Sequence, residues 1–183
     1  ERDRGLLLGF LDDFKAQHVR KIGEEYWVNF GPWTQRDYAH NLLYRVCTGI
    51  DARLSFEEIG HVLEGASGQR TEGRTHLLVK DREAFIIAPR YVIDRRSYQI
   101  TCEADLARLP FRLSLTKTPI AAVEFAPGRE WISAEVANFP FTIRLWQPGD
   151  VFSPLGMKGT KKVADFLNDM RVPRHHKDQT YVL

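Results

Sequence analysis

Basic side chains gather between residues 144 and 177, where they could hold an anion. The candidates are Arg144, Lys158, Lys161, Lys162, Arg171, Arg174 and Lys177. Lys158 lies in a glycine-bounded loop, whereas Lys161 and Lys162 are expected in the first turn of a helix, whose free N–H groups could help to bind the anion. The alternative is that all seven are solvated charges balanced by neighbouring acids. Those acids are Asp150, Asp165, Asp169 and Asp178.

The elements around these charges follow from turn signals and apolar spacing. Pro148-Gly149 predicts a tight turn after a strand over residues 141–146, and Asp150 is expected to close that turn. A loop is expected over residues 152–159, since two glycines and a proline interrupt regular structure there. A helix is predicted over residues 161–171 by apolar residues at helical spacing, and at i+4 Asp165 could pair with Lys161. The apolar residues are Val163, Phe166, Leu167 and Met170.

This stretch resembles the C-terminal domain of bacterial tRNA(Ile)-lysidine synthetases. The pattern is W-x-P-G-D-x-F, then P-L-G-M-K-G, then K-K-hydrophobic-x-D-F, then V-P-R. The matching residues are Arg144, Gly149, Asp150, Phe152, Pro154, Leu155, Gly156, Met157, Gly159, Lys161, Lys162, Asp165, Phe166, Pro173 and Arg174. Shorter similarities, such as Leu42-Leu43-Tyr44 and Ser67-Gly68, extend the resemblance toward the start of the chain. The alternative is an unrelated domain with a surface loop and an amphipathic helix.

The resemblance implies an enzyme that uses ATP to adenylate the wobble cytidine of the isoleucine tRNA with a CAU anticodon, after which lysine displaces AMP. Catalysis, ATP and Mg²⁺ would belong to an N-terminal PP-loop domain whose S-G-G-x-D-S motif does not occur in this sequence. The chain is therefore expected to be the C-terminal part of such a ligase, with its own end missing. We expect it to be inactive alone, with no catalytic residue, cofactor or metal site.

The resemblance assigns this part of the enzyme to the tRNA body, notably the acceptor stem. An A-form stem is recognised largely through its shape and phosphates, which suits lysine and arginine on rigid elements. The seven basic residues named above are the predicted tRNA contacts. The expected partner is the isoleucine tRNA, with a homodimer left open and neither DNA nor a membrane expected.

Composition supports a folded chain without deciding its partner. The 183 residues are 43% hydrophobic and 11% aromatic, which is enough for a packed core, and the formal net charge is only +2. Two widely spaced cysteines, Cys47 and Cys102, show no pairing pattern. No apolar run approaches the length of a membrane span. These features predict a cytoplasmic protein.

Periodicity along the chain predicts an α+β fold, with N-terminal helices followed by a mostly antiparallel sheet and a C-terminal helix packed on it. Helices are expected over residues 5–24, 35–47 and 55–64, the last with a capping box at Ser55 and Glu58. A hairpin is expected from strands at 75–80 and 84–88. Further strands are expected at 98–102, 111–116, 121–125, 130–134 and 141–146. The predicted domains are a linker helix (1–33), a helical plus hairpin subdomain (34–103) and the lysidine-synthetase-type domain (104–183).

Other functions stay open on the sequence alone. A protein-interaction or dimerisation module would need a contiguous exposed apolar patch, and a small-molecule site would need an apolar pocket with converging polar groups. His175-His176 lack a third ligand at metal spacing, so a surface pair near RNA is expected. Arg90, Arg95 and Arg96 lie near tyrosines and could touch RNA or solvate a strand edge.

Overall fold

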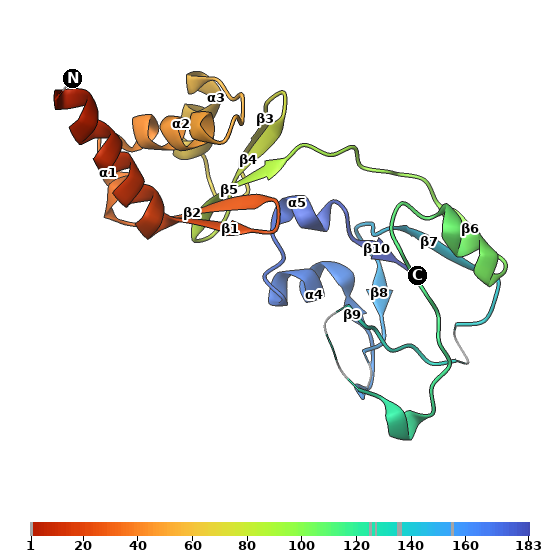
Figure 1. The fold of residues 1–183 in the computed structure, drawn as a ribbon. Helices are drawn as coiled ribbons and strands as arrows, with labels where there is room; N and C mark the ends of the chain where they lie inside the picture. The colour runs from red at the N-terminus through yellow and green to blue at the C-terminus, as the bar shows by residue number, and fades with distance from the viewer. Residues whose placement is uncertain (1, 125, 127, 135–136, 155) are drawn as a thin grey trace. The chain divides into compact units, whose positions relative to one another are not determined.

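Helices dominate the first part of the chain and antiparallel strands run through all of it, so the fold is α+β as predicted (Figure 1). The computed structural model describes residues 2–124, 126, 128–134, 137–154 and 156–183, and side chains from residue 9 onward within these ranges. The chain divides into two compact units, Glu1–Val92 and Ile93–Leu183. Within the described ranges, no helix is long and apolar enough to cross a membrane.

The first unit builds a sheet of five antiparallel strands in the order β1-β2-β5-β4-β3. Its helical elements are α1 (Arg2–His18), η1 (Pro32–Gln35), α2 (Ala39–Gly49) and α3 (Phe56–Glu64). Its strands are β1 (Val19–Ile22), β2 (Glu25–Asn29), β3 (Arg70–Glu72), β4 (His76–Lys80) and β5 (Ala84–Pro89). The predicted hairpin around residues 81–83 is thus confirmed as β4 and β5.

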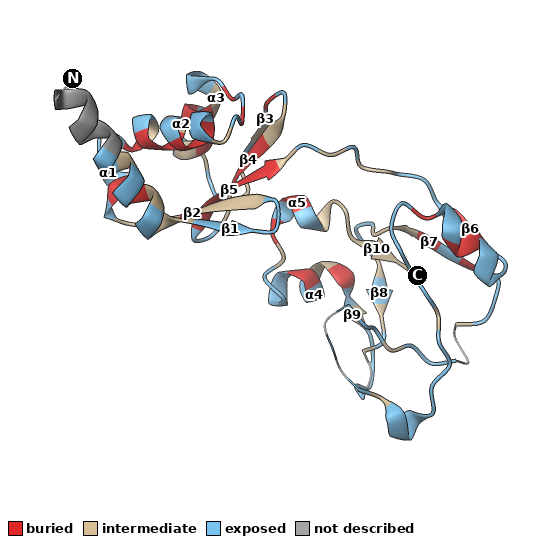
Figure 2. Cartoon of the chain, in the orientation of Figure 1, coloured by how far each residue is buried: buried red, intermediate tan, exposed pale blue. Residues whose placement is uncertain are grey.

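Strands β4 and β5 are apolar on both faces, because alternate side chains enter two different clusters. Leu78 and Ile87 join the main core with buried residues of α2 and α3 such as Leu43 and Ile59. Figure 2 shows the buried parts of β4 and β5 in red. A second cluster is formed by Leu77, Val79, Ile86 and Ala88, with Trp27 and Tyr91 packed against it. The pairing register of these strands is therefore strongly specified, because a slip of one residue would turn the side chains of each cluster to the opposite face of the sheet.

Two predicted helices of this unit have different bounds in the structure. The first helix ends at His18, and Val19–Ile22 forms a strand paired with β2 instead of continuing the helix to residue 24. Gly23 at φ 60 permits the tight turn between them, which helical periodicity alone could not indicate. The helix expected from residue 35 begins at Ala39, after a short 3-10 turn.

The second unit is built from short elements around a three-stranded antiparallel sheet, in the order β10-β7-β6, and a separate β8-β9 pair. The strands are β6 (Tyr98–Ile100), β7 (Phe141–Leu145), β8 (Val151–Phe152), β9 (Lys161–Lys162) and β10 (Tyr181–Val182). The helices are η2 (Glu103–Arg108), η3 (Ile120–Ala122), α4 (Val163–Asp169) and α5 (Arg174–Lys177). The core cluster contains Tyr98, Ile100, Leu106, Leu109, Phe141 and Ile143.

The predicted strands at 98–102 and 141–146 are confirmed as β6 and β7, but others are wrong. Residues 111–116 and 130–134 contain no strand, and residues 120–122 form η3, while position 125 lies outside the described residues. In the 111–116 segment the alternation has a different cause. The Phe111 ring lies 4.7 Å from that of Tyr181, and Leu115 packs against the core cluster. The alternating apolar residues Phe111 and Leu115 therefore pack against other parts of the unit, although the segment itself is not a strand.

Candidate functional site

The turn at Pro148-Gly149 is held by an ion pair between Arg144 and Asp150, two residues that carry the family resemblance. The two terminal guanidinium nitrogens of Arg144 donate to the Asp150 carboxylate, at 2.7 and 2.8 Å. The Gln147 amide also donates to this carboxylate at 2.7 Å, and the Asp150 amide donates back to the Gln147 carbonyl at 3.1 Å. Gly149 has φ 100, the conformation that this turn requires. The expectation that Asp150 closes the turn is confirmed.

This arrangement favours the charged form of both partners. The hydrogen bonds from Arg144, and then from the Gln147 amide, lower the pKa of Asp150 to about 2. The same carboxylate raises the pKa of Arg144 above its ordinary value. A bidentate pair also fixes the orientation of a guanidinium. In this structure Arg144 therefore holds Asp150 and the turn that follows β7. Its contact with tRNA stays a prediction.

Three predicted contacts, Lys158, Lys161 and Lys162, belong to a β hairpin. Strand β8 pairs with β9 through Val151↔Lys162 and Phe152↔Lys161, so the loop between them contains Lys158. Gly156 and Gly159 in that loop have φ 79 and 103, which explains why glycine stands at both positions. Position 155 of the motif lies outside the described residues.

The prediction that Lys161 and Lys162 begin a helix is wrong. Both lie in strand β9, and the helix α4 starts only at Val163 and ends at Asp169. The apolar spacing that predicted the helix is correct for α4, where Val163 and Leu167 are buried. Apolar periodicity could not show that the chain enters this helix from a strand pair, because the lysines carry no periodic signal.

The prediction that Lys161 pairs with Asp165 is also wrong. Its Nζ lies 2.6 Å from a carboxylate oxygen of Asp169, not from Asp165, and 5.7 Å from the centre of the Phe166 ring. The shift of the helix start explains the change, since the i+4 rule holds only within one helix. Because the Asp169 side chain is 65% exposed, this pair contributes little to stability.

The remaining predicted contacts lie after α4. Arg171 is exposed with φ 52, and Arg174 is exposed at the start of α5. Lys177 donates from Nζ to the Asn168 side chain at 2.5 Å, and its carbonyl accepts a 2.6 Å bond from the Trp146 indole. Lys177 thus fastens α5 to α4 and to the end of β7. The expected surface pair His175-His176 is half wrong, because His175 is buried and only His176 is exposed.

Exposure and internal pairing place six of the seven residues, all except Arg171, in two groups. Lys158, Lys162 and Arg174 are exposed, and among the residues that the structure describes none forms an ion pair or hydrogen bond with their side chains. We call these three the exposed basic set. Arg144, Lys161 and Lys177 instead bind Asp150, Asp169 and Asn168. The charges that could meet a phosphate without first breaking an internal pair are those of the exposed basic set.

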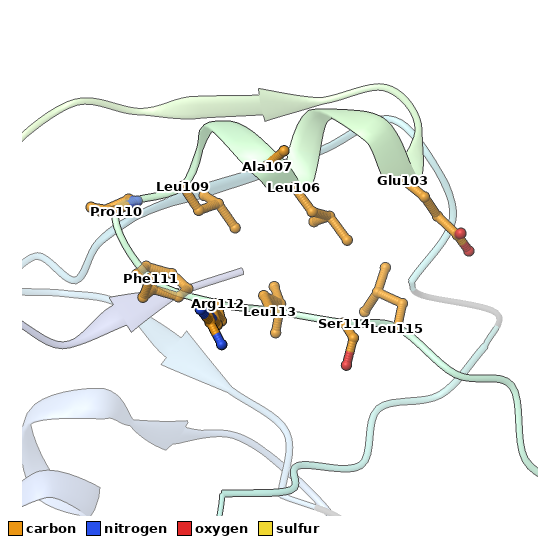
Figure 3. Close-up of a pocket in the computed structure, with 10 residues that line it drawn as sticks. All are labelled: Glu103, Leu106, Ala107, Leu109, Pro110, Phe111, Arg112, Leu113, Ser114 and Leu115. Carbon is orange, nitrogen blue, oxygen red and sulfur yellow. The ribbon is translucent and has the colours of Figure 1, made fainter.

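A hollow in the second unit lies between η2 and the segment that follows it (Figure 3). Its volume is about 810 Å³, and Leu106 and Leu109 line it from one side, facing Leu113 and Leu115. The polar side chains at its edge, Glu103, Arg112 and Ser114, are spread along the hollow without converging. A specific small-molecule site needs converging polar groups, so this hollow does not favour that function.

Two arginines of the predicted basic-aromatic group lie beside acidic residues. Arg96 forms an ion pair with Asp94 at 2.7 Å, and Arg90 lies 3.7 Å from Glu72, so these arginines are already balanced. Hydrogen bonds from Arg96 and Tyr98 hold the pKa of Asp94 well below its usual range.

Cys47 is buried, and burial raises the pKa of its thiol to about 12, which removes it as a nucleophile.

Known proteins similar to this chain share one description. The tRNA(Ile)-lysidine synthases of Parabacteroides distasonis and Geobacter sulfurreducens are each 31% identical to it over 72% of this chain. This chain matches a region of the tRNA(Ile)-lysidine synthases. The synthase of Bacteroides thetaiotaomicron is 25% identical over 69% of the chain. Each match covers less than a third of the synthase's own length, at 31%, 31% and 28%. No family model matches the chain.

Proposed function

We propose that this chain is the part of a tRNA(Ile)-lysidine synthase that holds the tRNA body. In the whole enzyme, a separate PP-loop domain would use ATP, Mg²⁺ and lysine to convert the wobble cytidine of the CAU-anticodon isoleucine tRNA to lysidine. This chain would bind the acceptor stem and select the tRNA without taking part in the chemistry. A cytoplasmic location follows from this proposal.

The observation that carries the proposal is the exposed basic set. Lys158, Lys162 and Arg174 offer cationic donors on a hairpin loop, a strand and a short helix, while neighbouring cations are paired internally. Donors on such elements suit the regular phosphates of an A-form stem, which is bound mainly by shape and charge. The chain is also similar to tRNA(Ile)-lysidine synthases, and this similarity supports tRNA as the partner.

A protein-interaction function is the second candidate, because exposed apolar side chains occur in the same stretch. Val151 is 56% exposed, Met157 and Met170 are each 63% exposed, and Phe166 is 38% exposed. Exposed methionine and aromatic side chains suit an adaptable protein surface. A concentration-dependent change in mass on sedimentation, abolished by Met170→Gln, would favour this candidate or a homodimer.

The tRNA proposal is tested by removing the exposed charges singly. Lys158→Gln, Lys162→Gln and Arg174→Gln keep much of the side-chain length and remove the charge. Each variant should lower the slope of log affinity against log salt by about 0.7 to 0.9 for a blunt acceptor-stem minihelix. The loss should not depend on stem sequence, since phosphate contacts do not read bases.

The matched control is Lys117→Gln, because Lys117 is also an exposed lysine of the second unit but lies outside the proposed surface. The control should keep the parent slope. If the three test variants bind the minihelix with the parent's affinity and slope, the exposed basic set does not contact the stem.

A further inference from the structure

A separate hollow of about 360 Å³ lies in the first unit, among α1, α2 and the start of α3. We call it the α2 pocket. Its side chains include Lys15 from α1, Asn41, Tyr44, Arg45 and Thr48 from α2, and Phe56 from α3. Two of these are cationic, two are aromatic and two are neutral hydrogen-bonding groups. No acidic residue is among the described residues that line it.

Phe56 is an exposed aromatic residue that is nonetheless held firmly. Its side chain is 44% exposed, yet its ring stacks on His40 at 3.5 Å with an interplanar angle of 15°. The His40 Nε2 also lies 2.5 Å from the Phe56 carbonyl oxygen, and the Tyr44 ring stands nearly edge-on at 5.5 Å. Because the ring is already ordered, a partner that stacks on it does not bear the entropy cost of ordering this side chain.

The surrounding sequence makes room for this arrangement. A Cβ at Gly60 would lie 2.6 Å from His40 Cε1, so glycine is needed for the imidazole to reach Phe56. A Cβ at Gly49 would lie 3.1 Å from the Lys15 ammonium, which places that charge over the end of α2 beside the pocket. The pocket therefore combines a preorganised aromatic face with two positive charges.

This combination matches one unpaired nucleotide. A base stacks on an aromatic ring irrespective of its sequence, its phosphate is attracted by lysine and arginine, and amide or hydroxyl groups can bond its edges. We propose that the α2 pocket binds an unpaired nucleotide of RNA, with the base on Phe56 and the phosphate beside Lys15 and Arg45. That the nucleotide belongs to RNA, and is not a free nucleotide, rests on the proposed function. The pocket would add a single-stranded contact to the stem contacts of the second unit.

The test uses the whole chain and labelled single-stranded hexauridylate, whose bases stack little on one another. Phe56→Leu keeps an apolar side chain but removes the aromatic face, and Arg45→Gln removes an exposed charge. Each should weaken hexauridylate binding roughly fivefold or more in fluorescence anisotropy. The controls are Tyr38→Leu and Arg36→Gln, exposed residues of the same unit outside the pocket, which should stay within about twofold of the parent.

The outcomes separate this site from the stem contacts. Loss of hexauridylate binding with unchanged binding of a blunt RNA duplex supports the α2 pocket, even if the exposed basic set proves irrelevant to the duplex. No binding of hexauridylate by the parent, or equal binding by Arg45→Gln and its control, would overturn it. Displacement of hexauridylate by UMP at equal nucleotide concentration would assign the pocket to a free nucleotide and overturn the RNA source. Arg45→Gln keeps the test decisive if Phe56→Leu folds poorly.

Discussion

At the scale of single residues, the charges of the second unit divide into those that hold the fold and those that are free to meet a partner. Arg144 and Asp150 are six positions apart and meet only because the turn at Gly149 reverses the chain. The sequence predicts that turn and the structural role of Asp150. It could not show that Arg144 is the partner, since pairing across a turn depends on side-chain geometry.

Asp150→Asn tests the pair through pH. A carboxylate with a lowered pKa stabilises the fold above the unfolded pKa of about 3.9, and this contribution disappears as pH falls through the native pKa of about 2. The variant should therefore melt a few degrees below the parent at pH 7, and the difference should shrink between about pH 4 and pH 2. Circular-dichroism melts across this range measure it.

Comparing variant with parent isolates Asp150, because Asp94 and Asp105 also have lowered pKa values and are present in both proteins. Equal melting temperatures at pH 7 with the same decline in acid would show that the pair with Arg144 contributes nothing to stability.

At the scale of elements, local signals predict well where the chain itself supplies the partner. The hairpin β4-β5 has its two strands adjacent in sequence, and α3 carries its cap in its own first turn. The segments at 111–116 and 130–134 alternate in the same way but form no strand. Alternation alone does not make a strand, because a strand also needs a neighbour that bonds its backbone.

Ser55→Ala tests the cap of α3. The Ser55 hydroxyl accepts from the Glu58 amide at 3.2 Å, and the Glu58 carboxylate accepts from the Ser55 amide at 2.7 Å. Losing the hydroxyl should cost about 1 kcal/mol, which corresponds to roughly 4–8 °C in the melting temperature of a unit of this size. Ser114→Ala, at an exposed position outside the helices and strands of the second unit, is a control for hydroxyl loss without a cap. An unchanged melting temperature for Ser55→Ala would mean that packing alone sets the start of α3.

At the scale of the whole molecule, bulk properties say little about the partner. A net charge of +2 is compatible with many functions, and only the position of each cation in the fold separates free charges from paired ones. The motif between residues 144 and 174 predicted a resemblance to the tRNA(Ile)-lysidine synthases, and the chain is 31% identical to two of them. The α2 pocket could not be predicted, because Lys15, Arg45 and Phe56 come from three helices and form no local pattern.

The most direct test of the central claim is the salt dependence of tRNA binding by the unmodified chain. Titration with the CAU-anticodon isoleucine tRNA at several salt concentrations should give a log–log slope of at least about 2 in magnitude, if the three members of the exposed basic set each meet one phosphate. The slope should be larger if the α2 pocket holds a further phosphate. Binding should weaken steadily as salt rises. An affinity for this tRNA that does not change with salt, or no binding even at low salt, would contradict the account.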